Sequence, residues 1–157
     1  MMTFKIPVSV LVVIHTPDNL ILLLERADHP GWWQSVTGSQ HPGETLWQTA
    51  VREVREETGL DAGAYRLTDW GYANVYEIFE CYRHRYAPDI TNNTEHVYGL
   101  EVPEALPVQL APREHLSYQW LPDELAAAKC FSPSNAEAIR NLAQLRNRIV
   151  PDSADQG

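Results

Sequence analysis

The first part of the chain carries two short apolar runs with turn residues between them. Residues 7–14 (PVSVLVVI) and 20–24 (LILLL) form the runs, and residues 15–19 (HTPDN) separate them. Apolar runs of this length joined by turn residues predict a buried hairpin. Because both runs are apolar at nearly every position, we expect helices on both faces of the sheet that contains them.

A helical pattern follows over residues 45–58. Its apolar side chains recur at intervals of three and four positions, which places them on one helix face; they are Leu46, Trp47, Ala50, Val51 and Val54. Gly59 stands directly after the segment, where a residue in the left-handed conformation commonly ends a helix. The pattern therefore predicts a helix that ends at Gly59.

The rest of the chain mixes aromatic and β-branched residues with polar ones, as strands do, and becomes helical toward its end. We expect a short extended piece at 33–36, strands at 67–86, 95–102 and 117–121, a loop at 88–93, and helices at 122–128 and 134–149. Residues 151–157 are small and polar, which predicts a disordered tail. The pattern as a whole predicts one α/β domain over residues 1–150.

Composition and charge limit the classes of function. The chain has 157 residues, enough to bury a substantial core, and 44% of them are hydrophobic. Its 21 acidic side chains exceed its 12 basic ones, which gives a formal net charge of −9. Such a surface repels nucleic-acid polymers. A small phosphorylated ligand would need a cation or a local basic cluster in order to bind.

The cysteines and the N-terminus bear on the cellular compartment. Cys81 and Cys130 lack metal-ligand spacing, and we expect both to be buried free thiols. The longest apolar run is too short to span a bilayer, and the N-terminus lacks the basic region and cleavage site of a signal peptide. The sequence therefore predicts a cytoplasmic enzyme that does not associate with membranes.

Three glutamates of the predicted helix carry the candidate chemistry. At about 100° per residue, Glu57 lies about 50° and Glu53 about 90° from the centre of the apolar stripe, where a carboxylate is costly unless compensated. Glu53, Glu56 and Glu57 crowd the negative end of the helix dipole, and Glu53 and Glu57 repel each other as i,i+4 neighbours. A divalent cation would reverse these penalties, and carboxylate oxygens suit Mg²⁺ or Mn²⁺.

An ordinary surface explanation stays open for part of this cluster. Arg52 and Glu56 are i,i+4 neighbours on the solvent side of the predicted helix, where they can form a surface ion pair. That explanation does not account for Glu57, which lies close to the apolar face.

The same segment resembles the signature of the Nudix hydrolase family. The pattern Gly-x5-Glu-x7-Arg-Glu-U-x-Glu-Glu-x-Gly-U, with U apolar, is matched throughout by Gly38, Glu44, Arg52, Glu53, Val54, Glu56, Glu57, Gly59 and Leu60. Seven fixed residues at about 7% each give a chance match on the order of 10⁻⁶ over a chain of this length.

The resemblance implies an α/β/α sandwich with a mixed β-sheet and Mg²⁺-dependent hydrolysis of a phosphoanhydride bond. It implies Glu53 and Glu57 as metal ligands, with Glu56 as a further ligand, directly or through water. Metal ions in such reactions neutralise the charge on the phosphoryl oxygens and activate the attacking water. Glu114, from a late loop, is then either a third ligand, a candidate base, or a solvated surface glutamate.

The other residues of the signature would have supporting roles. By the same resemblance, Arg52 orients the glutamates and Glu44 braces the first loop. Gly38 and Gly59 shape the two loops on either side of the helix.

Sequence outside the signature resembles one branch of the family, bacterial enzymes of folate synthesis that hydrolyse dihydroneopterin triphosphate to its monophosphate and pyrophosphate. The matching pieces extend over nearly the whole chain, at residues 5–14, 33–39, 77–79, 83–88, 93–95, 114–116 and 134–135. This resemblance implies substrate contacts at Lys5, Arg26, Thr37, Tyr76, Glu77, Ile78, Phe79 and Ser132, the last of which lies in a loosely matching segment.

The residues themselves leave alternatives open. Lys5 and Arg26 supply the positive charge that an acidic protein needs for a triphosphate, or they are solvated surface charges. Tyr76 and Phe79 stack on a flat heterocycle, or they belong to the core. The basic run 83–85 attracts the triphosphate, or it balances Asp89 and Glu95.

Three other functions compete with this interpretation. Two are enzymatic: a housecleaning pyrophosphohydrolase of nucleoside triphosphates such as dATP, and a hydrolase of dinucleoside polyphosphates. The third is a Nudix-like domain that binds a nucleotide ligand and regulates a partner without catalysis. Such domains commonly lose glutamates of the signature, whereas this chain keeps all of them.

Overall fold

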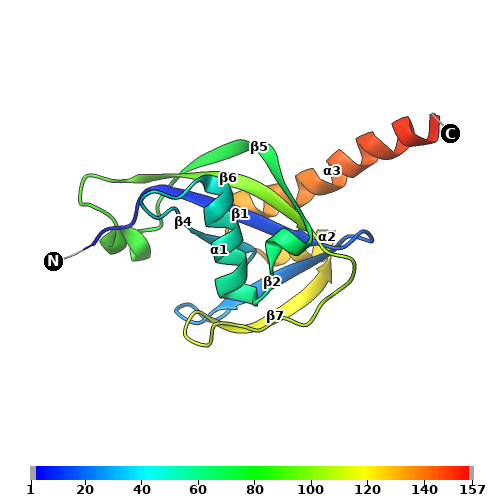
Figure 1. Cartoon of the computed structure of the whole chain (residues 1–157). Helices are drawn as coiled ribbons and strands as arrows, with labels where there is room; N and C mark the ends of the chain where they lie inside the picture. Colours follow the sequence, from blue (N-terminus) through cyan, green and yellow to red (C-terminus); the bar gives the residue numbers. More distant parts are fainter. Residues whose placement is uncertain (1–2, 156–157) are drawn as a thin grey trace.

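A mixed β-sheet forms the middle layer of the protein (Figure 1). The computed structural model describes residues 3–155, and over these residues seven strands form one sheet with the central order β3-β2-β1-β6-β5. β4 also pairs with β1, and β7 with β2. β1 and β6 are parallel, and the other pairs are antiparallel. The strands are β1 (Val8–His15), β2 (Leu20–Arg26), β3 (Trp33–Gln34), β4 (Val36–Ser39), β5 (Arg66–Glu77), β6 (Asn92–Glu101) and β7 (His115–Pro122).

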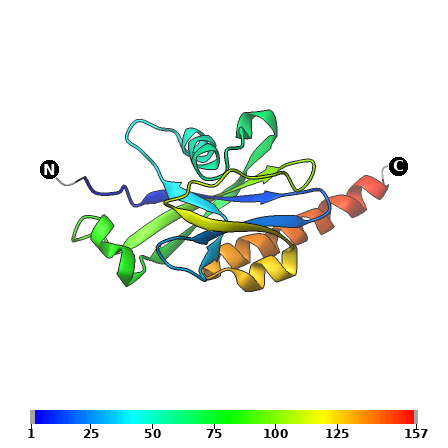
Figure 2. The same cartoon turned by 90° about the horizontal axis from the view of Figure 1, so that it is seen from below.

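Helices cover both faces of the sheet (Figure 2). α1 (Leu46–Thr58) lies on one face, and α2 (Asp123–Lys129) with α3 (Pro133–Asp155) lies on the other. Alternate residues of β1 point to opposite layers: Val10 and Val12 belong to the core under α1, whereas Leu11 and Val13 belong to the core under α2 and α3. This explains the nearly continuous apolar run, and the expected α/β/α sandwich is confirmed.

The predicted hairpin has the right direction but little pairing of its own. β1 and β2 are antiparallel and pair where His15 lies opposite Ile21. The first half of β1 pairs instead with β4, from Ser9 opposite Ser39 to Val12 opposite Val36. β2 pairs along its length with β7. The two apolar runs therefore bring together segments that are far apart in the sequence.

The expected strand over residues 67–86 is too long. β5 ends at Glu77, and a 3-10 helix, η2 (Glu80–Arg85), follows it. The chain turns there because local hydrogen bonds form, such as the one from the Tyr82 N–H to the Phe79 carbonyl at 2.8 Å. Cys81 is consequently exposed rather than buried, and Cys130 is half-buried; both are free.

The C-terminal helix extends further than its sequence suggests. α3 continues to Asp155, and residues 156–157 lie outside the described part. The disordered tail expected from the sequence stays a prediction. In the described residues, no helix is long and apolar enough to cross a membrane.

Local hydrogen bonds fix both ends of α1. Thr45 and Gln48 form a capping box, in which Gln48 N–H donates to Thr45 Oγ1 at 3.1 Å and Thr45 N–H donates to Gln48 Oε1 at 2.9 Å. At the other end Gly59 has a φ of 76°, and its N–H donates to the Arg55 carbonyl at 2.9 Å. The directions in which the helix glutamates point are therefore set by well-defined termini.

Gly59→Ala should lower the free energy of unfolding by about 1–2 kcal/mol, because left-handed backbone is strained for a residue with a Cβ. The new Cβ would also lie 3.2 Å from Gln109 Cβ. Urea denaturation measures the loss. Gly63→Ala is the control, since Gly63 has no positive φ and its Cβ would meet only Asp61 Oδ1, at 3.3 Å. Equal losses in the two variants would contradict this account.

Candidate active site

A cleft of about 600 Å³ brings together residues from α1, several strands and the loops that flank them. The structure gathers most of the predicted site residues along its wall. These are Lys5, Arg26, Thr37, Gly38, Arg52, Glu53, Glu56, Glu57, Tyr76, Ile78, Phe79, Glu114 and Ser132.

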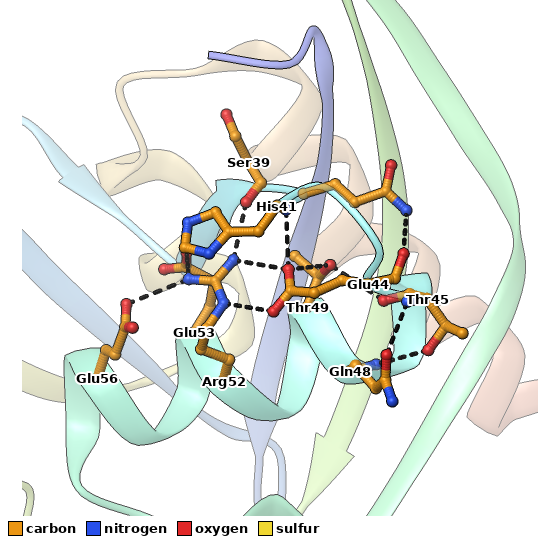
Figure 3. Close-up of polar contacts among 10 residues, drawn as sticks. Ser39, His41, Glu44, Thr45, Gln48, Thr49, Arg52, Glu53 and Glu56 are labelled. Atoms are coloured by element: carbon orange, nitrogen blue, oxygen red, sulfur yellow. Dashed lines mark hydrogen bonds and ion pairs between the residues drawn. The ribbon is translucent and has the colours of Figure 1, made fainter. Parts of the chain in front are cut away.

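Arg52 lies at the centre of the glutamate cluster on α1 (Figure 3). Its Nε and Nη2 donate to the two carboxylate oxygens of Glu44, at 2.7 and 3.0 Å. Nη1 donates to Glu53 Oε1 at 2.6 Å and to Glu56 Oε2 at 3.3 Å, and Nη2 also donates to the Ser39 carbonyl at 2.9 Å. The expected Arg52–Glu56 pair exists, but it is the longest of these contacts. The guanidinium is therefore fixed in position and orients Glu53.

Glu44 ties the first loop to α1. It accepts a hydrogen bond from the His41 backbone N–H at 2.8 Å and another from Thr49 Oγ1 at 3.0 Å. The hydrogen bonds from Arg52 lower the pKa of Glu44 to about 2, and the His41 and Thr49 donors act in the same direction. Glu44 is therefore ionised at neutral pH and holds Arg52 electrostatically.

Gly38 leaves the space that the Glu53 carboxylate occupies. A Cβ at this position would lie 2.1 Å from Glu53 Cδ and 2.2 and 2.4 Å from its two oxygens. Such contacts are impossible without a shift of the carboxylate, so β4 needs glycine here for close approach rather than for backbone freedom.

Glu57 is the buried member of the cluster. Its side chain is 2% exposed, and one carboxylate oxygen, Oε1, has no hydrogen-bond partner among the described residues. Burial raises its pKa well above the ordinary value, and the neighbouring Glu53 and Glu114 carboxylates raise it further. An unsatisfied buried carboxylate close to two others is unfavourable for folding. Function is the usual reason that such a site persists.

Glu114 joins the α1 glutamates from the loop before β7. Its backbone carbonyl accepts the Ala27 N–H at 2.9 Å, which anchors the loop to the end of β2. Burial raises the pKa of Glu114, and Glu53 and then Glu56 add to the effect. The carboxylate is therefore within electrostatic reach of α1, as a third ligand or a base would be.

The donor set fits a hard divalent cation. Several carboxylates and an unpaired buried oxygen match the chemistry of Mg²⁺ or Mn²⁺ sites. Within residues 3–155, no three acidic, His or Cys side chains already converge as the ligands of a bound ion do. Glu53 Oε1 is engaged by Arg52, so the carboxylates would need to draw together around a cation.

His115 packs against the buried glutamate. Its Nε2 lies 3.7 Å from Glu57 Oε1, and the imidazole is 5% exposed. Burial, with a contribution from Arg26, lowers the pKa of His115 to about 4. The ring is therefore neutral at neutral pH, and its contact with Glu57 is not an ion pair there.

Positive charge gathers on another part of the cleft wall. Arg26 donates to both carboxylate oxygens of Asp28, from Nε at 2.8 Å and Nη2 at 2.9 Å, and Arg85 pairs with the same carboxylate at 3.2 Å. Burial lowers the pKa of Lys5, and the neighbouring Arg85 lowers it further. Lys5 is exposed to solvent, but it lies at the wall of the cleft. Of the basic run, Arg85 lines the cleft, whereas Arg83 pairs with Glu77.

Glu77 is the exception among the predicted substrate contacts. Its side chain is 73% exposed and forms an ion pair with Arg83 outside the cleft. Neighbouring residues of a strand point to opposite faces, so Tyr76 and Glu77 cannot both point into the cleft. We therefore remove Glu77 from the candidate site.

The other predicted contacts have identifiable neighbours. Thr37 Oγ1 donates to the Val10 carbonyl at 2.9 Å, and Ser132 Oγ lies 3.0 Å from Ser134 Oγ. Phe79 lines the cleft beside Phe131, with 5.5 Å between ring centroids. It is therefore a wall residue and not a fully buried core residue.

Several cleft residues were not predicted from sequence. Some are direct chain neighbours of residues that were, and adjacency to a matched segment is the signal that points to them. The cleft residues without a predicted role are Asp28, Gln34, Tyr82, Asn93, Glu95, His115, Phe131 and Asn135.

The fold and this cleft together define the class of the protein. A glutamate-rich helix, held between two shaped loops, contributes its carboxylates to a cleft in an α/β/α sandwich. The NUDIX domain model matches residues 5–142. The chain therefore belongs to the NUDIX domain family.

Particular relatives are similar over most of their length. Dihydroneopterin triphosphate diphosphatase of Escherichia coli K12 is 48% identical over 142 residues, 88% of this chain and 93% of that protein. The Haemophilus influenzae protein of the same name is 43% identical and covers 89% of both chains. The structure of the E. coli dihydroneopterin triphosphate pyrophosphohydrolase superposes with a TM-score of 0.84 at 45% identity, covering 88% of this chain and 96% of that one.

Gly38→Ala should lower turnover in a pyrophosphate-release assay by about 10²-fold, since small misplacements of catalytic groups have effects of that size. The added Cβ would displace the Glu53 carboxylate from Arg52. Gly63→Ala serves again as the control, and a thermal melt verifies folding. Turnover in Gly38→Ala within a factor of two or three of the wild type would contradict the proposed contact.

Proposed function

We propose that this protein hydrolyses dihydroneopterin triphosphate to dihydroneopterin monophosphate and pyrophosphate with the help of Mg²⁺. The observation that carries the hydrolytic part is the buried Glu57 carboxylate, with its unpaired oxygen, beside Glu53 and Glu114. The substrate rests on the two curated relatives at 48% and 43% identity, which carry that activity in their names.

Glu53, Glu57 and Glu114 would hold the cation, with Glu56 within reach from the same helix. Bound Mg²⁺ supplies charge neutralisation at the phosphate oxygens and lowers the pKa of the attacking water, and Mn²⁺ is a chemically plausible substitute. The bond between the α- and β-phosphates breaks, and water provides the oxygen and the protons that complete the two products.

The protein's own residues position the reactants. Arg52 holds Glu53 while Glu44 holds Arg52, so the orientation of Glu53 is restrained before substrate binds. Lys5 and Arg26 contribute the local positive charge that a triphosphate requires in a protein of net charge −9. The attacking water must lose a proton, and a carboxylate of raised pKa, such as Glu114, is suited to accept it.

The competing functions have less support. An Ap4A hydrolase of Caenorhabditis elegans superposes with a TM-score of 0.70, but at 20% identity that likeness concerns the fold alone. A domain that only binds nucleotides would have no need to bury Glu57 beside two other carboxylates, at a cost in stability.

A comparison of substrates tests the proposed function. With Mg²⁺, kcat/KM should be higher for dihydroneopterin triphosphate than for dATP or Ap4A. Release of pyrophosphate or phosphate measures the three rates. A wide margin in favour of dATP or Ap4A would assign the enzyme to one of the competing classes. Tight binding without turnover of any substrate would favour the regulatory domain.

Glu57→Gln should reduce turnover by about 10²-fold or more, since even residues that merely support metal ligands contribute up to that factor. Without metal its free energy of unfolding should equal or exceed that of the wild type, because the substitution removes a buried, repelled carboxylate. Glu53→Gln should lose turnover similarly. Glu80→Gln, at an exposed position outside the cleft, is the control. Near-native turnover of Glu57→Gln at ordinary Mg²⁺ would exclude it as a ligand.

A further inference from the structure

A second polar group lines the cleft on β6, separate from the α1 glutamates. Asn93 and Glu95 are two positions apart on this strand, so their side chains lie on the same face. They are 1% and 4% exposed, and both line the cleft. None of the roles assigned to the metal ligands or the phosphate-binding cations uses these two residues.

The side-chain amide of Asn93 has a buried acceptor without a donor among the described residues. Its Nδ2 donates to Ser9 Oγ at 2.8 Å and to Tyr76 Oη at 3.1 Å, which fixes the orientation of the amide. Oδ1 is buried and has no partner among the described residues. Buried amide oxygens are nearly always satisfied, so this one is free for a donor that a ligand brings.

Glu95 is a buried carboxylate with few donors. Its Oε1 accepts a hydrogen bond from Ser134 Oγ at 3.0 Å, and it takes part in none of the ion pairs found among the described residues. Burial raises its pKa, although Ser134 and Asn74 oppose the shift. A carboxylate offers about four lone-pair sites, so further N–H donors would be favourable here.

The surroundings of this pair suit a flat ring. Ile78, Phe79 and Phe131 line the same cleft and provide apolar wall. Glu95 lies on β6 and accepts a hydrogen bond from Ser134 at the start of α3, whereas Glu57 lies on α1. The cleft thus has a carboxylate cluster on α1 and buried acceptors on β6, and apolar side chains form part of its wall.

We propose that Glu95, with Asn93 beside it, recognises the edge of the pterin ring that carries the amino group and the adjacent ring N–H. These two donors lie side by side and match the two oxygens of a carboxylate. Asn93 Oδ1 accepts a further N–H of the ring system. The identity of the ligand rests on the proposed function, whereas the recognised edge does not, since guanine carries the same pair of donors.

Recognition of this edge by Glu95 should make the cleft discriminate between bases. Adenine presents an amino donor next to a ring acceptor, so a carboxylate would face a lone pair on that edge. A site built to pair with substrate N–H groups rejects analogues that lack them by large factors. Glu95 would therefore be the residue through which the cleft prefers pterin or guanine over adenine.

A purely structural role for Glu95 makes a different prediction. Its hydrogen bond with Ser134 lies at the beginning of α3, where the helix dipole also stabilises a carboxylate. If Glu95 only anchored that helix, Ser134→Ala would reproduce the effect of Glu95→Gln. If Glu95 recognises the ring, Ser134→Ala keeps the carboxylate and hence the preference between bases.

The test measures kcat/KM for dihydroneopterin triphosphate, dGTP and dATP in wild type, Glu95→Gln and Ser134→Ala. Glu137→Gln, at an exposed position on α3, is the matched control. In Glu95→Gln we expect losses of about 10²-fold or more for the pterin and guanine substrates, with dATP changing less than about threefold. Ser134→Ala and Glu137→Gln should leave these ratios near those of the wild type.

Unchanged ratios in Glu95→Gln, or equal changes in Ser134→Ala, would overturn the inference. If Glu95→Gln fails to fold in a thermal melt, Glu95→Asp replaces it, because that variant keeps the charge but withdraws it by one methylene. A loss of the preference in Glu95→Asp supports recognition, and a retained preference refutes it. Failure of wild type to hydrolyse dihydroneopterin triphosphate would refute the proposed substrate alone, because the ratio of dGTP to dATP still tests Glu95.

Discussion

Repulsion among the carboxylates at the C-terminal half of α1 is the constraint on which the rest of the site depends. Glu57 is buried with one unpaired oxygen, and Glu53 and Glu114 both raise its pKa. Without a cation this arrangement opposes folding, because like charges in a poorly solvated place repel strongly. The fold must therefore supply enough stability elsewhere to keep the carboxylates together until a cation reduces their repulsion.

The surrounding structure provides that support in two ways. Arg52 spreads its guanidinium over Glu44, Glu53 and Glu56, so that part of the negative charge is neutralised in a fixed geometry. The two apolar cores on either face of β1 hold the helix and the strand in place. Gly38 lets β4 approach closely enough for the Glu53 carboxylate to fit above it. The packing of the two cores, the charge of Arg52 and the lack of a side chain at Gly38 together restrain the carboxylates of α1.

The sequence predicts what depends on local periodicity, and it misses what depends on distant contacts. The angular positions of Glu57 and Glu53 on α1 predicted that both lie near the buried face. In the structure these residues are 2% and 8% exposed. The end of β5 was not predictable, because the segment after it also bonds to distant parts of the chain: the Lys5 N–H donates to the Arg85 carbonyl at 2.8 Å. From the sequence, Glu95 had no role beyond a charge that the basic run 83–85 could balance. Its burial depends on α3, which begins almost forty positions later in the chain.

The most direct test of the central claim is the unfolding free energy of the wild-type protein as a function of Mg²⁺ concentration at constant ionic strength. A cation that binds the folded state between the carboxylates stabilises it in proportion to the logarithm of its concentration once the site is nearly saturated. We predict such a rise for Mg²⁺, and none when NaCl of the same ionic strength replaces it. A stability that does not change with Mg²⁺ would contradict the claim that these glutamates form a cation site.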